Sequence, residues 1–209
     1  MLSLKQRLTA YRVIPVVTPT SVDATLSLAR ALSAGGIGAI EITLRTQNAL
    51  DVLRAVKESD IAIEVGVGTV TSSSLVEAVA EIGVSFAISP GLTRSVLDAA
   101  RANELELLPG VATPSELMIG LEYGLDFFKL FPAEAVGGRQ MLKALSGPFP
   151  SLSFCPTGGI GPSNVQDYLA LANVACVGGS WMVPKSALEA GDWQTIERLS
   201  REALELTRS

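Results

Sequence analysis

One lysine lies inside an apolar segment, where a charged side chain is costly. Lys129 stands in the run Phe127-Phe128-Lys129-Leu130-Phe131-Pro132. A buried ammonium group must be paired or neutral, and dry surroundings favour the neutral amine, which is a nucleophile. In a strand, alternation would place Phe127, Lys129 and Phe131 on one side. Two interpretations follow: an imine-forming lysine, or a lysine that snorkels to solvent or pairs with a carboxylate.

Polar residues also interrupt a second apolar segment. Glu41, Thr43 and Arg45 alternate along the chain, so a strand would direct all three to one face. A carboxylate beside an imine-forming lysine can move protons during carbinolamine formation and carbon–carbon bond cleavage. The planar guanidinium of Arg45 matches a substrate carboxylate. The alternative is an internal ion pair of Glu41 with Arg45 or Lys129, and Glu64 competes with Glu41 for the acid–base role.

Two glycine clusters indicate where a phosphate could bind. Gly158-Gly159 precedes a helix that Pro162 is expected to open, and Gly178-Gly179-Ser180 ends a later apolar run. Loop N–H groups and helix starts bind phosphate at this place in parallel barrels. One glycine pair more often marks a tight turn. Two pairs on adjacent strands of the same sheet end favour a phosphate site.

The residue types that are absent narrow the chemistry. The chain of 209 residues has no histidine, and its two cysteines, Cys155 and Cys176, have no CxxC or zinc-type spacing. A Ser-His-Asp triad and His-ligated metal sites are therefore excluded. Carbonyl chemistry without a His-ligated metal needs another electron sink, and a protonated imine provides one.

Charge and hydropathy predict the setting. The net charge is −5 and there is no basic run, so nucleic-acid binding is not expected. No segment approaches the roughly 18 to 20 apolar residues of a membrane span. Residues Met1 to Tyr11 lack the apolar core of a signal peptide. We expect a soluble, cytoplasmic protein without a membrane or nucleic-acid partner.

Short apolar runs alternate with amphipathic segments along the whole chain. Eight runs are strand-like: Val13–Val17, Ala39–Leu44, Ile61–Val67, Ser85–Ile88, Glu106–Leu108, Phe127–Leu130, Leu152–Cys155 and Ala175–Val177. Their spacing fits a repeated strand–loop–helix unit and hence a parallel sheet, and eight strands can close a barrel. An open doubly wound sheet is the alternative, although no glycine fingerprint follows Val13–Val17.

Helix signals fill the segments between these runs. Ser21–Ala34 begins with a capping residue, and Thr113-Pro114-Ser115-Glu116 combines an N-cap, a proline and a first-turn acid. An amphipathic helix over Leu2–Tyr11 precedes the first strand and could plug one end of the barrel, and Asp192–Thr207 forms the last helix. We predict one domain, residues 1–209, with a (β/α)8 TIM-barrel fold and an additional N-terminal helix.

Six segments, in order along nearly the whole chain, resemble a known enzyme family. The family comprises the 2-keto-3-deoxy-6-phosphogluconate (KDPG) aldolases and 4-hydroxy-2-oxoglutarate (KHG) aldolases. The segments are Glu41–Thr46, Gly66–Val70, Ala87–Gly91, Phe128–Glu134, Cys155–Ile160 and Gly178–Trp181. Glu64 departs from the family pattern, in which an apolar residue is expected at that position.

The resemblance implies a class I aldolase that splits KDPG into pyruvate and glyceraldehyde 3-phosphate. It implies a homotrimer that uses no metal or other cofactor. Lys129 would form the imine, and Glu41 would be the general acid and base, acting through a water. The carboxylate and pyruvyl group of the substrate would be held by Arg45, Thr69, Pro90 and Phe131, and its hydroxyls and phosphate by Thr157, Gly158, Gly159, Gly179 and Ser180.

Several alternatives remain open on the sequence. A close variant cleaves 4-hydroxy-2-oxoglutarate into pyruvate and glyoxylate, and another acts on the galactonate epimer of KDPG. A non-catalytic phosphosugar-binding barrel would keep the glycine clusters and use Lys129 and Glu41 as a structural ion pair. A phosphosugar isomerase or epimerase would use Glu41 as a base without cleaving a carbon–carbon bond.

Overall fold

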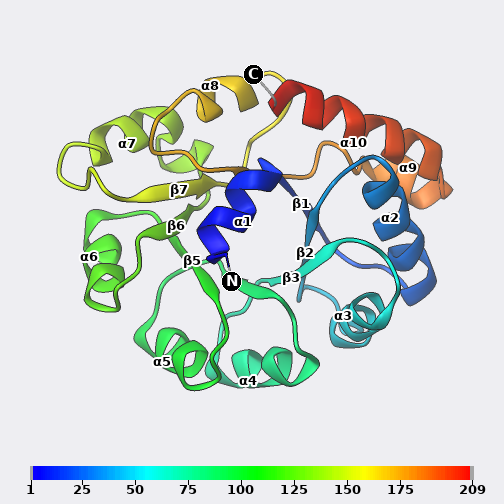
Figure 1. The fold of residues 1–209 in the computed structure, drawn as a ribbon, viewed down its shortest axis with the longest axis horizontal. Coiled ribbons are helices and arrows are strands. Elements are labelled where there is room, and N and C mark those ends of the chain that lie inside the picture. Colours follow the sequence, from blue (N-terminus) through cyan, green and yellow to red (C-terminus); the bar gives the residue numbers. More distant parts are fainter. Residues whose placement is uncertain (1, 208–209) are drawn as a thin grey trace.

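The protein is a curled sheet of parallel strands with helices around it (Figure 1). The computed structural model describes residues 2–207. Its strands are β1 Val13–Val17, β2 Ala39–Thr43, β3 Glu64–Gly68, β4 Phe86–Ser89, β5 Leu107–Val111, β6 Phe127–Leu130, β7 Ser153–Pro156 and β8 Val177–Gly179. They form one sheet in the order β7-β6-β5-β4-β3-β2-β1-β8. Because β8 pairs in parallel with β1, the sheet curls back toward its own start.

The two edges of the curled sheet meet without a continuous ladder among the described residues. Two isolated parallel bridges join the segments that contain β7 and β8: Phe154 of β7 pairs with Val174, which precedes β8, and Thr157, which follows β7, pairs with Gly178 of β8. The Phe154 N–H donates to the Asn173 carbonyl at 2.8 Å, and its carbonyl accepts from the Ala175 N–H at 2.9 Å. The predicted curled, parallel α/β sheet is confirmed, whereas a fully closed barrel stays a prediction.

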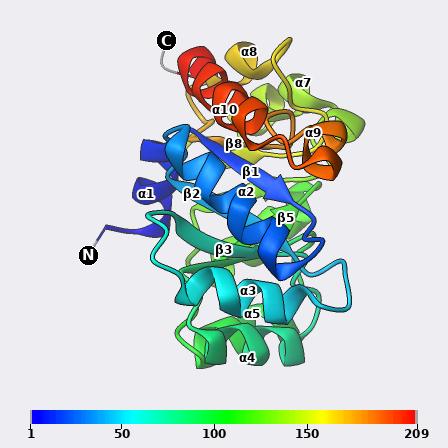
Figure 2. The same ribbon diagram turned by 90° about the vertical axis from the view of Figure 1, so that its right-hand side faces the viewer.

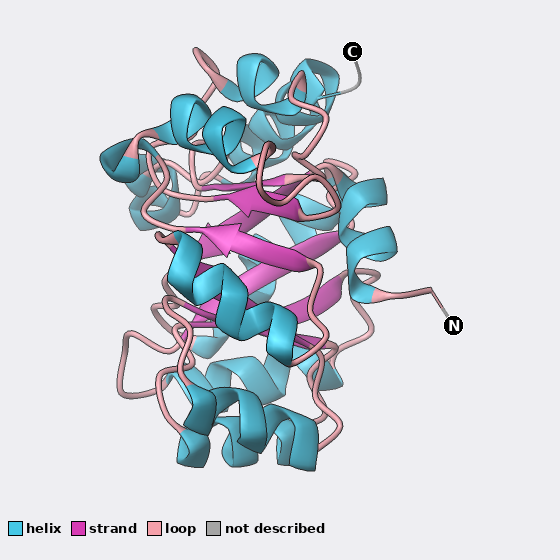
Figure 3. Cartoon of the chain, turned by 90° about the vertical axis from the view of Figure 1, so that its left-hand side faces the viewer, coloured by secondary structure: helices cyan, strands magenta, loops and turns pink. Residues whose placement is uncertain are grey.

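Helices cover the outer face of the sheet (Figures 2 and 3). They are α2 Val22–Ala34, α3 Ala49–Glu58, α4 Ser73–Ile82, α5 Arg94–Ala102, α6 Pro114–Glu122, α7 Gly138–Leu145, α8 Val165–Leu169, α9 Lys185–Ala190 and α10 Trp193–Thr207, with a 3-10 turn at Glu134–Val136. The predicted caps are confirmed at two starts: Ser21 caps α2, and Thr113 forms a capping box with Glu116 on α6. No helix within residues 2–207 has the length and apolarity needed to cross a membrane.

Alternation along the strands divides the core into two clusters. Phe128 and Leu130 belong to the cluster between the sheet and its helices, while Phe127 belongs to the cluster inside the curled sheet. On β2, Ile40 belongs to the cluster between the sheet and its helices, and Ala39 belongs to the cluster inside the curled sheet. Lys129 has the parity of Phe127, and Glu41 has the parity of Ala39, so both charged side chains enter the interior of the sheet.

The N-terminal helix closes one end of this interior, as predicted. Helix α1, Leu4–Tyr11, lies across the centre of the curled sheet in Figure 1. Its Leu4 and Leu8 belong to the same buried cluster as Ala39 and Phe127, the first residues of β2 and β6. The opposite end, where the strands finish, is left for the polar side chains.

The structure corrects the start of the third strand and the interpretation of Glu64. The strand begins at Glu64 rather than Ile61, because a tight turn, with the Ile63 N–H donating to the Ile61 carbonyl at 2.8 Å, precedes it. Glu64 therefore lies at the end that α1 covers. Its carboxylate accepts from Arg7 Nε and from the Tyr11 hydroxyl, both at 3.0 Å. Glu64 anchors α1 and does not compete with Glu41.

Substitution of Arg7 should separate stability from activity. Arg7 also pairs with Glu106 at 2.6 Å, and its side chain is 17% exposed. We expect Arg7→Met to lower the free energy of unfolding by about 1–3 kcal/mol, because Glu64 loses a charged partner in a half-buried site. The kcat value should stay within about twofold, since Arg7 lies at the end opposite the polar strand termini.

The control is Arg54→Met, measured by the same denaturant titration. Arg54 and its partner Asp51 are both exposed, so its loss should cost less than about 0.5 kcal/mol. Equal costs for the two variants would contradict an anchoring role for Arg7.

Candidate active site

A buried ion pair joins opposite sides of the sheet interior. Lys129 Nζ on β6 lies 3.2 Å from Glu41 Oε1 and 3.4 Å from Oε2 on β2. Lys129 is 4% exposed and Glu41 is 2% exposed. The Phe131 ring lies near the amine, with its centroid 5.1 Å from Nζ. Each of the two groups therefore has a partner at a place where water is scarce, and the amine and carboxylate are in direct hydrogen-bond contact.

The carboxylate of Glu41 fits because β3 carries glycine next to it. Glu41 and Thr43 are opposite Gly66 and Gly68 in the parallel ladder. A Cβ atom at Gly68 would lie 2.1 Å from Glu41 Oε1. A side chain at this position would displace the carboxylate, so the Gly68 site is needed for the ion pair.

Arg45 and Thr69 lie together just beyond the ends of β2 and β3. Arg45 Nε donates to Thr69 Oγ1 at 3.2 Å. Thr69 has φ 64°, in the left-handed region that β-branched residues rarely adopt. Strained backbone of this kind persists where surrounding contacts impose it and is concentrated at functional sites. The pair presents a guanidinium and a hydroxyl at the end of the sheet where β2 and β3 finish.

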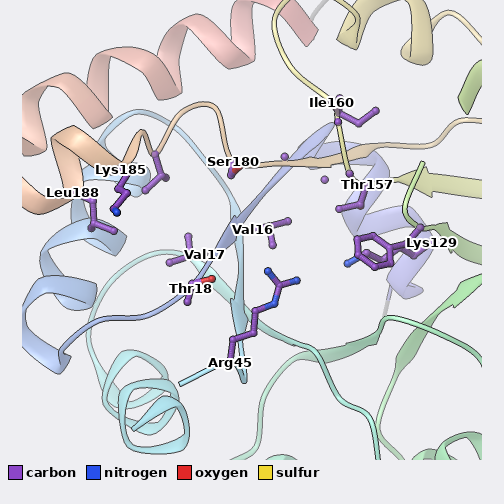
Figure 4. A pocket seen from close by; sticks show the side chains of 16 residues that line it. Val16, Val17, Thr18, Arg45, Lys129, Thr157, Ile160, Ser180, Lys185 and Leu188 are labelled. Atoms are coloured by element: carbon purple, nitrogen blue, oxygen red, sulfur yellow. The ribbon is translucent and has the colours of Figure 1, made fainter. Parts of the chain in front are cut away.

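The strand ends surround a cavity of about 380 Å³ (Figure 4). This volume suits a small metabolite. The cavity contains most of the predicted site residues, namely Arg45, Lys129, Phe131, Thr157, Gly158, Gly159, Gly179 and Ser180. Glu41 and Thr69 are not among the lining residues, but each is hydrogen-bonded to one that is: Glu41 to Lys129 and Thr69 to Arg45. Pro90 is not among the lining residues; its carbonyl packs against Gly110 of β5.

Sequence reasoning missed the other residues that line the cavity. These are Val16, Val17, Thr18, Val183, Lys185 and Leu188, whereas Ile160 and Gly178 belong to the glycine-containing segments already singled out in the sequence. Thr18 could have been found, because it is the first polar residue after the apolar run that becomes β1. Lys185 and Leu188 could not, since they lie on a six-residue helix whose position depends on the tertiary fold.

The two glycine clusters line the cavity. Gly158 and Gly159 have φ values of 101° and 82°, which side chains other than glycine rarely allow. The last strand was predicted over Ala175–Val177 but runs from Val177 to Gly179, so the second cluster is part of the sheet. A Cβ atom at Gly178 would lie 2.3 Å from Thr157 Oγ1, which explains how β7 and β8 approach so closely.

The loop after β6 is packed onto the loop after β7. The Ala133 N–H donates to the Thr157 carbonyl at 2.8 Å, and the Glu134 N–H donates to the Gly158 carbonyl at 3.1 Å. The Glu134 carboxylate accepts a hydrogen bond from the fully buried Tyr168 hydroxyl on α8. Burial, and then this carboxylate, raise the pKa of Tyr168 well above its usual value.

The comparisons with known proteins agree with this geometry. The family model described as KDPG and KHG aldolase matches residues 4–199. The chain belongs to this aldolase family. The match spans every residue of the cavity described above.

Relatives cover almost the whole chain. It is 49% identical over 203 residues to a KHG/KDPG aldolase of Escherichia coli (strain K12), covering 97% of this chain and 95% of the relative. A Legionella pneumophila KDPG aldolase, solved with pyruvate as a covalent carbinolamine intermediate, is 46% identical with a TM-score of 0.92, over 95% of this chain and 96% of that one. The Zymomonas mobilis ZM4 KDPG aldolase with 3-phosphoglycerate is 39% identical with a TM-score of 0.92, over 99% and 97%.

A methyl group at Gly68 tests whether β3 must make room for Glu41. Gly68→Ala should lower the free energy of unfolding by about 1–3 kcal/mol, because the added carbon overlaps the carboxylate. Gly147→Ala is the matched control, since Gly147 is exposed and its nearest neighbour would be 3.8 Å away. Urea titrations of both variants measure the difference. A Gly68→Ala variant as stable as Gly147→Ala would contradict the steric argument.

Removal of the Tyr168 hydroxyl should change the alkaline stability profile. The pKa of Tyr168 is raised above its usual 10.0 in the folded state. Its proton therefore stabilises the fold at pH below about 10, and this contribution is lost as pH rises above that value. Tyr168→Phe should be less stable than wild type by about 1–3 kcal/mol at pH 7. It should also lose less further stability between pH 10 and 11.

Denaturant titrations at pH 7, 10 and 11 measure this effect. Tyr123→Phe is the control, because its hydroxyl donates to an exposed Asp98 at 2.8 Å and its loss should cost less than about 1 kcal/mol. Parallel pH profiles for wild type and Tyr168→Phe would contradict the assignment.

Proposed function

We propose that the protein is a class I aldolase that cleaves KDPG into pyruvate and glyceraldehyde 3-phosphate. The observation that carries the proposal is the Lys129 amine, buried 3.2 Å from the Glu41 carboxylate at a cavity that the glycine loops also line. A nucleophilic amine, a proton carrier and an anion site are the three groups that the reaction needs.

Lys129 gives a proton to the paired Glu41 carboxylate, and its neutral Nζ attacks the C2 carbonyl of the keto acid to form a carbinolamine. Glu41, acting through a water, moves the protons that release the C2 oxygen as water and leave a protonated imine. Glu41 then takes the proton of the C4 hydroxyl, the C3–C4 bond breaks, and its electron pair passes to the imine to give an enamine. Protonation of C3 and hydrolysis of the imine release pyruvate and restore the amine.

The remaining residues hold the substrate. The guanidinium of Arg45, with the hydroxyl of Thr69, binds the pyruvate carboxylate. Phe131, which lines the cavity, packs against the pyruvyl group, and Pro90, which does not line it, remains a predicted contact of that group. Thr157 contacts the substrate hydroxyls, and the backbone N–H groups of Gly158, Gly159 and Gly179, with the Ser180 hydroxyl, bind the phosphate.

The proposal extends to the assembly and the fold. The chain forms a single domain, residues 1–209, as a closed (β/α)8 barrel, with the β7–β8 bridges as the closing seam. It works as a cytoplasmic homotrimer and needs no metal or other cofactor, because the protonated imine supplies the electron sink.

Two neighbouring activities fit the same residues. Cleavage of 4-hydroxy-2-oxoglutarate would give pyruvate and glyoxylate, and cleavage of the galactonate epimer of KDPG would use the same imine. Values of kcat/KM for the three substrates rank them directly. The double name of the E. coli relative, KHG/KDPG aldolase, favours activity on both 4-hydroxy-2-oxoglutarate and KDPG.

Borohydride trapping tests the imine. Reduction in the presence of pyruvate should leave a covalent adduct on Lys129, located by mass spectrometry of peptides. Lys129→Met should give no adduct, and Glu41→Gln should lower kcat by about 100-fold or more because the proton carrier is lost. Lys143→Met, on the exposed surface of α7, is the matched control and should behave as wild type.

Other outcomes identify the alternatives. An adduct on another lysine would overturn the mechanism. No adduct and no pyruvate release, with a loss of stability in Lys129→Met, would indicate a binding protein with a structural ion pair. Exchange of substrate protons with solvent and no cleavage would indicate an isomerase or epimerase.

A further inference from the structure

One cation at the cavity has no role in the proposed reaction. Lys185, the first residue of α9, lines the cavity together with Leu188 of the same helix. Figure 4 shows both on the opposite side of the pocket from Lys129, with Ser180 between. Lys129 forms the imine end, so Lys185 lies toward the end that receives the distal part of the substrate.

The charge balance of the cavity gives this lysine a use. The cationic residues among its lining are Arg45, Lys129 and Lys185, and the described lining includes no carboxylate residue. Arg45 is held by Thr69, and Lys129 by Glu41. The glycine loops offer only N–H dipoles and the Ser180 hydroxyl to a phosphate that carries nearly two negative charges. An exposed ammonium group is a suitable point-charge partner for such a group.

The existing partner of Lys185 leaves it available. Its Nζ lies 3.5 Å from Glu189 Oε1, four residues on, and both side chains are exposed, at 86% and 64%. Such pairs are weak because solvent screens them and two long side chains must be ordered. A phosphate in the cavity would compete well with Glu189 for the ammonium group.

We propose that Lys185 is a specificity-determining residue that favours phosphorylated keto acids over unphosphorylated ones. This inference rests on the proposed function and adds a second charge to its phosphate end. It makes KDPG a better substrate than 4-hydroxy-2-oxoglutarate, whose distal group is a carboxylate on a shorter chain. Lys185 acts on substrate binding and does not take part in the proton transfers.

The test is steady-state kinetics of Lys185→Met on both substrates. We expect KM for KDPG to rise about fivefold, kcat to stay within about twofold, and both constants for 4-hydroxy-2-oxoglutarate to change by less than about twofold. Lys185→Arg should restore KM for KDPG. Glu189→Gln should lower it, because the competing carboxylate is gone. Lys57→Met, at an exposed position of α3, is the matched control.

A binding measurement separates this inference from the proposed function. Calorimetry with 3-phosphoglycerate and with glycerate reports the phosphate contact without turnover. Lys185→Met should weaken 3-phosphoglycerate about fivefold and leave glycerate unchanged. If Lys185→Met weakens 3-phosphoglycerate binding in this way but the wild-type protein releases no pyruvate from KDPG, the phosphate contact is supported and the aldolase function is rejected. Equal effects on phosphorylated and unphosphorylated ligands, or no effect on either, would overturn the role of Lys185.

Discussion

The ion pair between Lys129 and Glu41 is the constraint on which the rest of the site depends. Both groups are removed from water, and neither could be buried alone without a large cost in free energy. The curled sheet brings them within 3.2 Å from strands that are far apart in the sequence. Gly68 leaves the space that the carboxylate occupies. The Lys129 amine is thereby held between two strands of the sheet, in contact with the carboxylate.

The two ends of the sheet interior divide stability from chemistry. At the strand starts, α1 is fixed by Arg7 and Tyr11 on Glu64, and Leu4 and Leu8 fill the apolar interior. At the strand ends, Thr69 has a strained backbone conformation and the cavity leaves space unfilled. Both features lower the stability of the fold, and the well-packed opposite end offsets this loss. With the covered end closed, the cavity lies at the ends of the strands.

Period-two alternation explains what the sequence could predict. It places Lys129 beside Phe127, and Glu41 beside Ala39, in the interior, and both predictions are confirmed by the packing. Alternation could not place Glu64, because its meaning depends on whether the strand starts three residues earlier, and a local turn decides that. Nor could it reveal Lys185, whose approach to the cavity is set by how a short helix follows β8. The position of Lys185 depends on contacts between residues far apart in the sequence, which a local pattern does not reveal.

In the proposed substrate, the phosphate lies far from the carbonyl that would react with Lys129. Binding of the phosphate can therefore assist the reaction only by positioning that carbonyl. Binding energy from a remote group aids catalysis only if it positions the reacting atoms, which requires a stiff connection. The hydrogen bonds from Ala133 to Thr157 and from Glu134 to Gly158 tie the loop after Lys129 to the glycine loop. The buried Tyr168 holds Glu134 from behind. A phosphate seated on those glycines would therefore be fixed in relation to the strand that carries the amine.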